Sequence, residues 1–392
     1  MLKFNPNKSN CTGCAACYSV CPVHCITMVP DEEGFLYPEA SSDACIKCNL
    51  CEKICPLNNE KKKNDYPKIA YAAVSKDYKI WHRSASGGAF SEIVRHWADK
   101  DTLIVGAAWN GLKVHHVGVI GFDNILPLCK SKYISSPVEE TFKEIYEQLK
   151  KGGKAIFCGC PCQVDGLNRF LKKEYDNLLT IDLICHGQGS PLVFEKCMKF
   201  ISNQLGEDVV SYEFRSKRKV YESDYLAMLT TNKSKYYIYN DPYIQLFLNQ
   251  DALRPSCGEN CKYRDIRRMG DITIADFKGL TKIYPDLLGT KRNWSTVVSN
   301  TKKGELISSS LCTTMQVRRC SIDDIIKYNP LFAHQTKSSE NRKYFFEDFL
   351  NEPMGAIIKH TKPLRMVNNN LMRTIFNIAP SFLRKLYYKL RY

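Results

Sequence analysis

The sequence lacks the features that mark membrane-spanning, secreted and dinucleotide-binding proteins. No stretch reaches the roughly 18 uninterrupted apolar residues of a membrane-spanning helix, so we expect no integral membrane protein. The N-terminal segment has no apolar core like that of a secretory signal peptide, so we expect a cytoplasmic protein. No Gly-x-Gly-x-x-Gly motif occurs, and a Rossmann-type nucleotide site is therefore not indicated.

Acidic residues are missing from the C-terminal end, where the positive charge is concentrated. The net charge is +15, and the last forty residues contain eight Lys or Arg and no Asp or Glu. No nucleic-acid recognition motif accompanies this charge, so we expect no nucleic-acid partner. The segment 353–392 alternates basic with apolar residues and is interrupted by Pro380. It fits an amphipathic helix on an anionic membrane surface, at the inner face of the membrane, and equally a terminal helix docked on the body.

Cysteine is abundant, with 19 residues in a chain of 392. The number is odd and the chain is long, so a small disulfide-stabilised scaffold is excluded. In a reducing compartment, clustered cysteines are more often metal ligands than disulfides.

Eight of the cysteines form two runs with identical spacing. Each run reads Cys-x2-Cys-x2-Cys-x3-Cys-Pro, the pattern of bacterial two-cluster ferredoxins, in which the fourth Cys of each run ligates the other cluster. Zinc sites usually pair cysteines across a longer spacer, which disfavours zinc. We therefore assign one 4Fe–4S cluster to Cys11, Cys14, Cys17 and Cys55. The other cluster is assigned to Cys45, Cys48, Cys51 and Cys21.

The rest of the chain alternates strand and helix patterns, which predicts a mixed α/β fold with layers around a partly parallel sheet. Apolar runs predict strands at 103–108, 155–157, 178–184 and 272–275, and helical spacing predicts helices at 88–98, 138–149 and 163–171. Thiols and polar groups follow three of these strands. Because ligands bind beyond the carboxyl ends of strands in open α/β sheets, we expect a site there. The residues concerned are Cys158, Cys160, Cys162, Cys185, His186 and Asp276.

A further pair, Cys257 and Cys261, lies in a basic stretch that begins at Arg254 and includes Arg264 and Arg268. Cations near a thiolate-bound cluster would raise its reduction potential. The same arginines would equally suit a phosphate-bearing cofactor, and both interpretations stay open at this point.

The chain resembles the family of coenzyme F-420 hydrogenase/dehydrogenase beta subunits, with a fused two-cluster ferredoxin module. Its N-terminal Cys runs are the ferredoxin part of the resemblance, and six segments carry the rest. These segments are 82–88, 131–136, 159–167, 185–191, 214–217 and 271–279. The resemblance implies an FAD and iron–sulfur oxidoreductase with a third 4Fe–4S cluster, whose ligands fall on Cys162, Cys185, Cys257 and Cys261. Cys160 stands where the family usually has Thr, and neither it nor Cys158 is assigned as a ligand.

The resemblance also implies where FAD would bind. The Ser86-Gly87-Gly88 turn before a helix would cradle the pyrophosphate. Other candidate cofactor contacts are Lys132, Tyr133, Arg215, Lys217 and Asp276. Lys132 and His186 are the candidate catalytic residues, although His186 also fits a structural role beside a ligand Cys. Trp294 departs from the family pattern and would narrow the acceptor pocket, so the deazaflavin coenzyme is not taken as the substrate.

Together these expectations divide the chain into five segments. They are a ferredoxin domain at 1–60, a linker at 61–68, a layered α/β flavin and iron–sulfur body at 69–150 and 151–335, and a basic tail at 336–392. The expected function is electron transfer from a ferredoxin-like donor through the clusters to FAD and then to a small-molecule acceptor. The alternative is a non-catalytic relay subunit that works with a redox partner protein.

Overall fold

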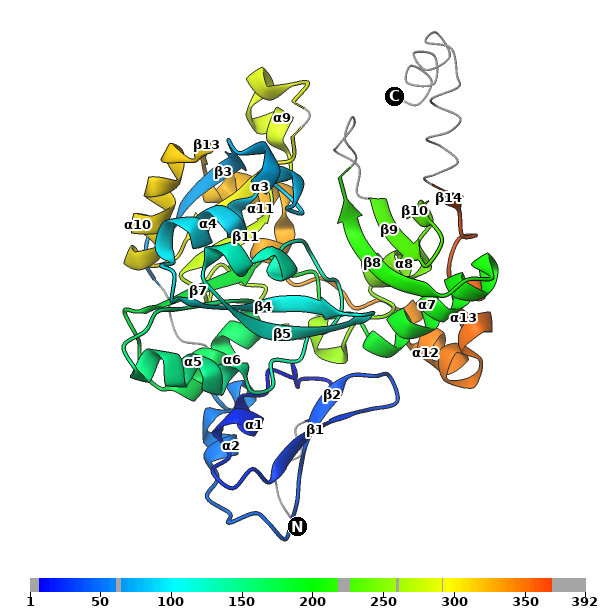
Figure 1. The fold of residues 1–392 in the computed structure, drawn as a ribbon. Helices are drawn as coiled ribbons and strands as arrows, with labels where there is room; N and C mark the ends of the chain where they lie inside the picture. The colour runs from blue at the N-terminus through cyan, green and yellow to red at the C-terminus, as the bar shows by residue number, and fades with distance from the viewer. Residues whose placement is uncertain (1–6, 61–64, 218–225, 259–260, 291, 369–392) are drawn as a thin grey trace.

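The computed structural model describes residues 7–60, 65–217, 226–258, 261–290 and 292–368. Figure 1 shows a small N-terminal module, a large sheet covered by helices, and a smaller sheet that packs on the C-terminal helices. The fold is mixed α/β, as the alternating pattern predicted.

The N-terminal module (residues 7–60) contains the two Cys runs. Its elements are α1 (Ala16–Val20), β1 (Ile26–Pro30), β2 (Leu36–Ala40) and α2 (Leu50–Ile54), with β1 and β2 paired antiparallel. The two runs have the same backbone: Gly13 and Ala15 in the first run, and Lys47 and Asn49 in the second, all have φ between +56° and +65°. Left-handed residues at equivalent places turn each loop tightly around the space that its thiols face.

An eight-stranded mixed sheet forms the body, in the order β13-β3-β12-β11-β7-β6-β4-β5. The strands β4, β6, β7 and β11 are parallel, and the others pair antiparallel. The sheet joins strands from both sides of residue 150, so the two expected body segments share one sheet. The strands are β3 (Ile69–Ser75), β4 (Leu103–Asn110), β5 (Lys113–Ile120), β6 (Ala155–Gly159), β7 (Leu178–Leu183), β11 (Ile272–Asp276), β12 (Ser295–Ser299) and β13 (Met315–Cys320).

Helices cover both faces of this sheet because its central strands are apolar on both sides. On one face, α5 (Thr141–Lys150) and α6 (Pro161–Leu171) pack on Val105 and Phe157. On the other face, α4 (Ala89–Trp97) and α10 (Lys302–Ser310) pack on Ile104 and Ile156. The remaining helices of the body are α3 (Tyr78–His82), α9 (Leu280–Ile283) and α11 (Ile322–Tyr328).

The smaller sheet is antiparallel, in the order β14-β10-β9-β8, and its core is rich in aromatic side chains. Its strands are β8 (Val209–Ser216), β9 (Leu226–Thr231), β10 (Lys235–Ile238) and β14 (Met366–Asn368). Its helices are α7 (Pro191–Leu205), α8 (Pro242–Leu248), α12 (Asn341–Asn351) and α13 (Pro353–His360).

The segment expected as a separate tail is therefore largely built into this unit. Residues Phe345, Phe349 and Ile357 of α12 and α13 are fully buried in its core, and β14 completes its sheet. Residues 369–392, which carry most of the predicted amphipathic tail, lie outside the described residues. Within the described part of the chain, no helix combines the length and apolarity that a bilayer crossing requires.

Candidate functional site

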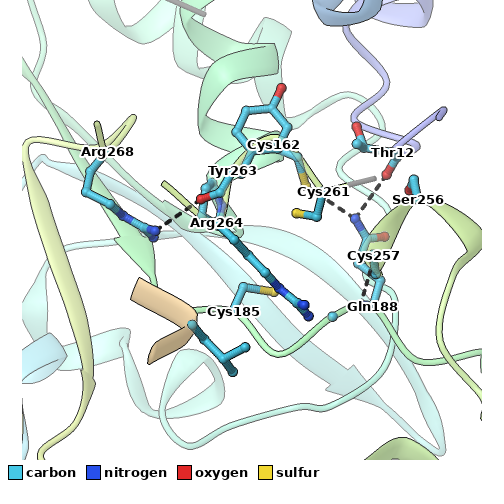
Figure 2. A pocket seen from close by; sticks show the side chains of 13 residues that line it. Thr12, Cys162, Cys185, Gln188, Ser256, Cys257, Cys261, Tyr263, Arg264 and Arg268 are labelled. Carbon is cyan, nitrogen blue, oxygen red and sulfur yellow. Dashed lines mark hydrogen bonds between the residues drawn. The ribbon is translucent and has the colours of Figure 1, made fainter. Parts of the chain in front are cut away.

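Four cysteines from three separate segments line one cavity at the carboxyl edge of the parallel strands, with about 420 Å³ of empty volume (Figure 2). Cys162 lies in the first turn of α6, and Cys185 follows β7. Cys257 ends a short 3₁₀ helix (Pro255–Cys257), and Cys261 lies just beyond it. These are the four positions that the family resemblance implied, so the structure brings the whole expected set together. We call them the third-cluster cysteines.

Hydrogen bonds from Gln188 hold two of these sulfurs. The Gln188 backbone N–H donates to Cys257 Sγ at 3.3 Å, and its side-chain Nε2 donates to Cys162 Sγ at 3.3 Å. Nε2 also donates to the Thr12 carbonyl oxygen at 3.0 Å, and Thr12 belongs to the first Cys run of the N-terminal module. Donors that point at sulfur stabilise a thiolate and tune a cluster bound through it. Sequence reasoning assigned no role to Gln188, although it lies in the segment after Cys185.

The protonation of these thiols depends strongly on burial. Burial raises the pKa of Cys162 well above its usual value and that of Cys257 to about 12. The hydrogen bond from Cys160 lowers the pKa of Cys185 to about 7. Buried thiols ionise fully only when a metal neutralises their charge, because an uncompensated charge in an apolar site is costly. Among the residues that the structure describes, no three His, Cys, Asp or Glu side chains converge closely enough for one metal ion.

A fifth thiol lies beside the cavity. Cys160 is the N-cap residue of α6, and its sulfur is 3.7 Å from Cys185 Sγ. Cys158 lies on the strand β6 itself, where burial raises its pKa to about 12. Cys160 is thus close enough to Cys185 to influence it, whereas Cys158 packs in the sheet against the apolar cluster of α4.

Two arginines bring positive charge to the same cavity. Arg264 Nη2 donates to the His186 carbonyl oxygen at 2.6 Å. Arg268 is buried and forms an ion pair with the fully buried Asp182, with 3.1 Å between Nη2 and Oδ1. Both side chains line the cavity, as the basic flank of the Cys257 pair predicted. Cations placed here favour an anionic group in the cavity.

The structure also gathers the cysteines assigned to the first ferredoxin cluster. Burial raises the pKa of Cys14 to about 12, and the neighbouring Cys11 and Cys55 raise it further. The pKa of Cys17 is raised well above its usual value by burial and by the same neighbours. Cys55 comes from the second run, so the exchange of the fourth ligand between runs matches the observed grouping.

The second ferredoxin group is nearer the surface. Cys21, Cys45 and Cys51 share one small apolar cluster, and Cys48 is exposed. Cys25 is buried in the same cluster, as expected for a small apolar residue, and its sulfur lies 3.4 Å from Cys21 Sγ. This group therefore lies at the outer side of the module, whereas the first group lies against the body.

The N-terminal module contacts the body beside the third-cluster cysteines. A Cβ atom at Gly166 of α6 would lie 3.0 Å from Cys14 Cβ and 3.2 Å from Cys14 Sγ. Gly166 follows Cys162 by one helical turn, so both residues lie on the same face of α6. The absence of a side chain at Gly166 therefore lets a first-group cysteine approach the third-cluster site.

The Ser86-Gly87-Gly88 turn is filled by packing. The Gly87 backbone N–H donates to Ser295 Oγ at 2.9 Å, and Ser86 Oγ donates to the Trp294 carbonyl oxygen at 2.8 Å. A Cβ at Gly87 would lie 2.5 Å from the Ser295 nitrogen. The turn therefore serves close packing against β12, which differs from the pyrophosphate cradle expected from sequence.

The other candidate cofactor residues meet between the two sheets. Arg215 Nη1 donates to Asp276 Oδ2 at 2.7 Å, and Tyr133, whose pKa burial raises, lies beside them. Tyr133 stacks on Phe247 with ring centroids 5.1 Å apart. The Lys217 ammonium donates to two backbone carbonyl oxygens and lies 3.9 Å from the centre of the Trp81 ring.

Three buried polar atoms at this place have no hydrogen-bond partner among the described residues. They are Asp276 Oδ1, Asn293 Oδ1 and Trp294 Nε1. Buried polar groups are almost always paired, and clustered exceptions are explained by a ligand or ordered water. The donor set, two acceptors and one donor beside Arg215, fits a polar heterocycle such as the isoalloxazine of FAD.

Lys132 and His186 make different kinds of contact. Lys132 Nζ donates to the carbonyl oxygens of Pro127 and Cys129, at 2.9 and 2.7 Å, and burial lowers its pKa to about 8. His186 Nε2 lies 3.1 Å from the Phe247 carbonyl oxygen, to which it donates, and burial lowers its pKa. This bond fixes the His186 ring in place beside Cys185, in agreement with the structural alternative.

Comparisons with known proteins point to the same family as the sequence motifs. Residues 152–324 match the family described as the C-terminal part of coenzyme F420 hydrogenase/dehydrogenase beta subunits, and residues 10–59 match the 4Fe–4S dicluster domain. A curated relative, the F polypeptide of the F(420)H(2) dehydrogenase of Methanosarcina mazei, is 25% identical over 230 residues. The match covers 55% of this chain and 64% of that protein, so the chain spans less than two thirds of the relative's length. A solved structure of the F420-reducing NiFe hydrogenase complex from Methanosarcina barkeri is 17% identical, with a TM-score of 0.45, covering 73% of this chain and 95% of that one.

Proposed function

Because residues 152–324 belong to the family of coenzyme F420 hydrogenase/dehydrogenase beta subunits and residues 10–59 form a 4Fe–4S dicluster domain, we propose that the chain is an iron–sulfur flavoprotein oxidoreductase. The observation that carries the proposal is the convergence of Cys162, Cys185, Cys257 and Cys261 on one cavity, close to the first ferredoxin group. Three 4Fe–4S clusters would supply single-electron transfer, and FAD would supply the exchange between one-electron and two-electron chemistry.

The chain's own residues support this assignment at the third-cluster cavity. Gln188 donates hydrogen bonds to two of the four sulfurs, and Arg264 and Arg268 bring positive charge to the cavity wall. This set stabilises four thiolates that burial would otherwise keep protonated. The cavity also lies next to α6, whose residue Gly166 contacts Cys14, so the third-cluster site and the first ferredoxin group are neighbours.

The flavin part rests on the polar group between the sheets. Arg215 and Asp276 would hold the flavin ring system, with Tyr133 as a stacking partner and Trp294 as a hydrogen-bond donor. Lys132, with a pKa near 8, has the acidity suited to proton delivery near neutral pH. His186 would position the loop that follows β7.

Partners enter at the outer side of the N-terminal module. The exposed Cys48 and the half-buried Cys45 and Cys51 place the second ferredoxin group where a donor protein can approach. The acceptor of the electrons is a small organic molecule, or a partner protein when the chain acts as a relay. The curated relative is named as one of the subunits in an F(420)H(2) dehydrogenase, which favours assembly with other subunits.

Spectroscopy of the protein purified under anaerobic conditions tests the proposal. We expect visible and EPR spectra of three 4Fe–4S clusters and an extractable FAD. The variant Asp276→Asn with Arg215→Met should lose the flavin and keep the iron. Three clusters without any yellow chromophore would support the relay alternative, whereas two clusters without flavin would contradict the proposal.

A further inference from the structure

Arg254 of the body extends into the N-terminal module. Its side chain is 1% exposed, although it is a cation. Arg254 Nε donates to the Cys11 carbonyl oxygen at 2.7 Å, and Nη2 donates to the Leu36 carbonyl oxygen at 2.8 Å. The guanidinium lies 4.2 Å from the centre of the Tyr37 ring. Its contacts are therefore with the first ferredoxin group, not with the third-cluster cysteines beside which the sequence places it.

The charge of Arg254 has no carboxylate partner within the described part of the chain. Two other buried or half-buried arginines do: Arg268 pairs with Asp182, and Arg342 pairs with Glu33. Burial of a lone cation costs several kcal/mol unless an anion compensates it. The sulfur of Cys11 lies 3.9 Å from Arg254 Nη2. A cluster ligated by thiolates is anionic, and it would supply the missing negative charge at this place.

The backbone of Arg254 is tied to the other site. Its N–H donates to the Gln188 carbonyl oxygen at 2.9 Å, and its carbonyl oxygen accepts from the Cys257 N–H at 2.9 Å. A Cβ atom at Gly13 would lie 2.8 Å from Arg254 Nη1, and Gly13 has φ of +65°, so glycine is needed there for both space and conformation. One residue thus links the loop of the third-cluster cysteines to the loop of the first ferredoxin group.

We propose that Arg254 is the counter-charge of the first ferredoxin cluster and the residue that sets its reduction potential from the body. The proposal rests on the proposed function in that Cys11, Cys14, Cys17 and Cys55 hold a cluster. Reduction adds one electron and makes the cluster more negative, so a fixed cation beside it favours the reduced state and raises the potential. Arg254 is a positioning residue, because it acts through a cluster ligand. By this placement the electron is held in the cluster nearest the body.

Potentiometric titration of the anaerobic protein, followed by EPR and visible spectra, tests the proposal with three variants. Arg254→Met removes the charge at similar length, and Arg254→Lys keeps the charge with fewer hydrogen bonds. Arg318→Met is the matched control, because Arg318 is exposed and bonded to Asp286. We expect Arg254→Met to lower the midpoint potential of one cluster only, Arg254→Lys to restore most of it, and Arg318→Met to change none.

The identity of the shifted cluster is checked by removing ligands. The shift should persist in a Cys162→Ala background and vanish in a Cys14→Ala background. If Arg254→Met instead loses about four iron atoms while Arg254→Lys retains them, the charge role is equally supported. Unchanged potentials in Arg254→Met, or equal effects of Met and Lys, would overturn the proposal while the clusters of the parent protein remain. A parent protein without clusters would refute the proposed function itself.

Discussion

Removal of the Asp182 carboxylate should destabilise the body and the third-cluster site together. Asp182 follows the buried core of β7 and is fully buried. Its Oδ2 accepts from the Met269 and Gly270 N–H groups, both at 3.0 Å. Its Oδ1 accepts from Thr273 Oγ1 at 2.6 Å and from Arg268 Nη2 at 3.1 Å. In Asp182→Ala, Arg268 would remain buried without its counter-charge.

The expected magnitude follows from that burial. Loss of one partner of a buried ion pair costs about 3–5 kcal/mol, because the other charge stays desolvated. An exposed pair contributes at most about 1 kcal/mol. Asp286→Ala, which breaks the exposed pair with Arg318, is therefore the matched control. A loss of about 3–5 kcal/mol is a large share of the roughly 5–15 kcal/mol by which domains are stable.

Urea unfolding under anaerobic conditions, followed by tryptophan fluorescence, measures both free energies. Iron analysis of each variant adds the second readout, because Arg268 lines the cavity beside Cys185. We expect Asp182→Ala to unfold at clearly lower urea and to lose the third-cluster iron first. Equal unfolding midpoints for Asp182→Ala and Asp286→Ala would refute the reasoning.

Three further predictions concern single residues. Gly166→Val should separate the N-terminal module from α6, because its side chain would meet Cys14 at about 3.0 Å; limited proteolysis should then cleave near residue 60 faster, and unchanged cleavage would contradict the contact. Cys160→Ala should raise the pKa of Cys185 in the iron-free protein from about 7 towards its ordinary value, since it loses the hydrogen bond of Cys160; thiol labelling at pH 7 should slow, and labelling as fast as in a Cys312→Ala control would be evidence against it. Lys132 should react with an amine reagent half-maximally near pH 8, because burial disfavours its charged form, so that it is protonated below that pH and neutral above it; a midpoint near that of exposed lysines would show that burial does not act on it.

Local patterns in the sequence predicted the parts of the site that short segments determine. The spacing of the two Cys runs fixes the repeated left-handed residues Ala15 and Asn49, because each loop must turn its thiols to one side. The parallel strands β6, β7 and β11 follow from their apolar runs, and polar residues at their carboxyl ends met as expected. The exchange of Cys55 between the two groups agrees with the order of the runs.

Contacts between distant segments could not be read in the same way. Arg254 lies three residues before Cys257, and only the docking of the module places its guanidinium at Cys11. Gly87 was expected to face a phosphate, but its N–H pairs with Ser295 of a strand more than 200 residues later. Residues near 350 were expected in a free tail, but the sequence does not reveal that the smaller sheet needs their aromatic side chains in its core.

Iron and acid-labile sulfide content per chain is the most direct test of the central claim that three clusters are present. The parent protein, purified under anaerobic conditions, should contain about twelve iron atoms, and Cys162→Ala should contain about eight. Cys312→Ala, which removes an exposed thiol outside all three groups, should leave the content unchanged. About eight iron atoms in both the parent protein and Cys162→Ala would contradict the account.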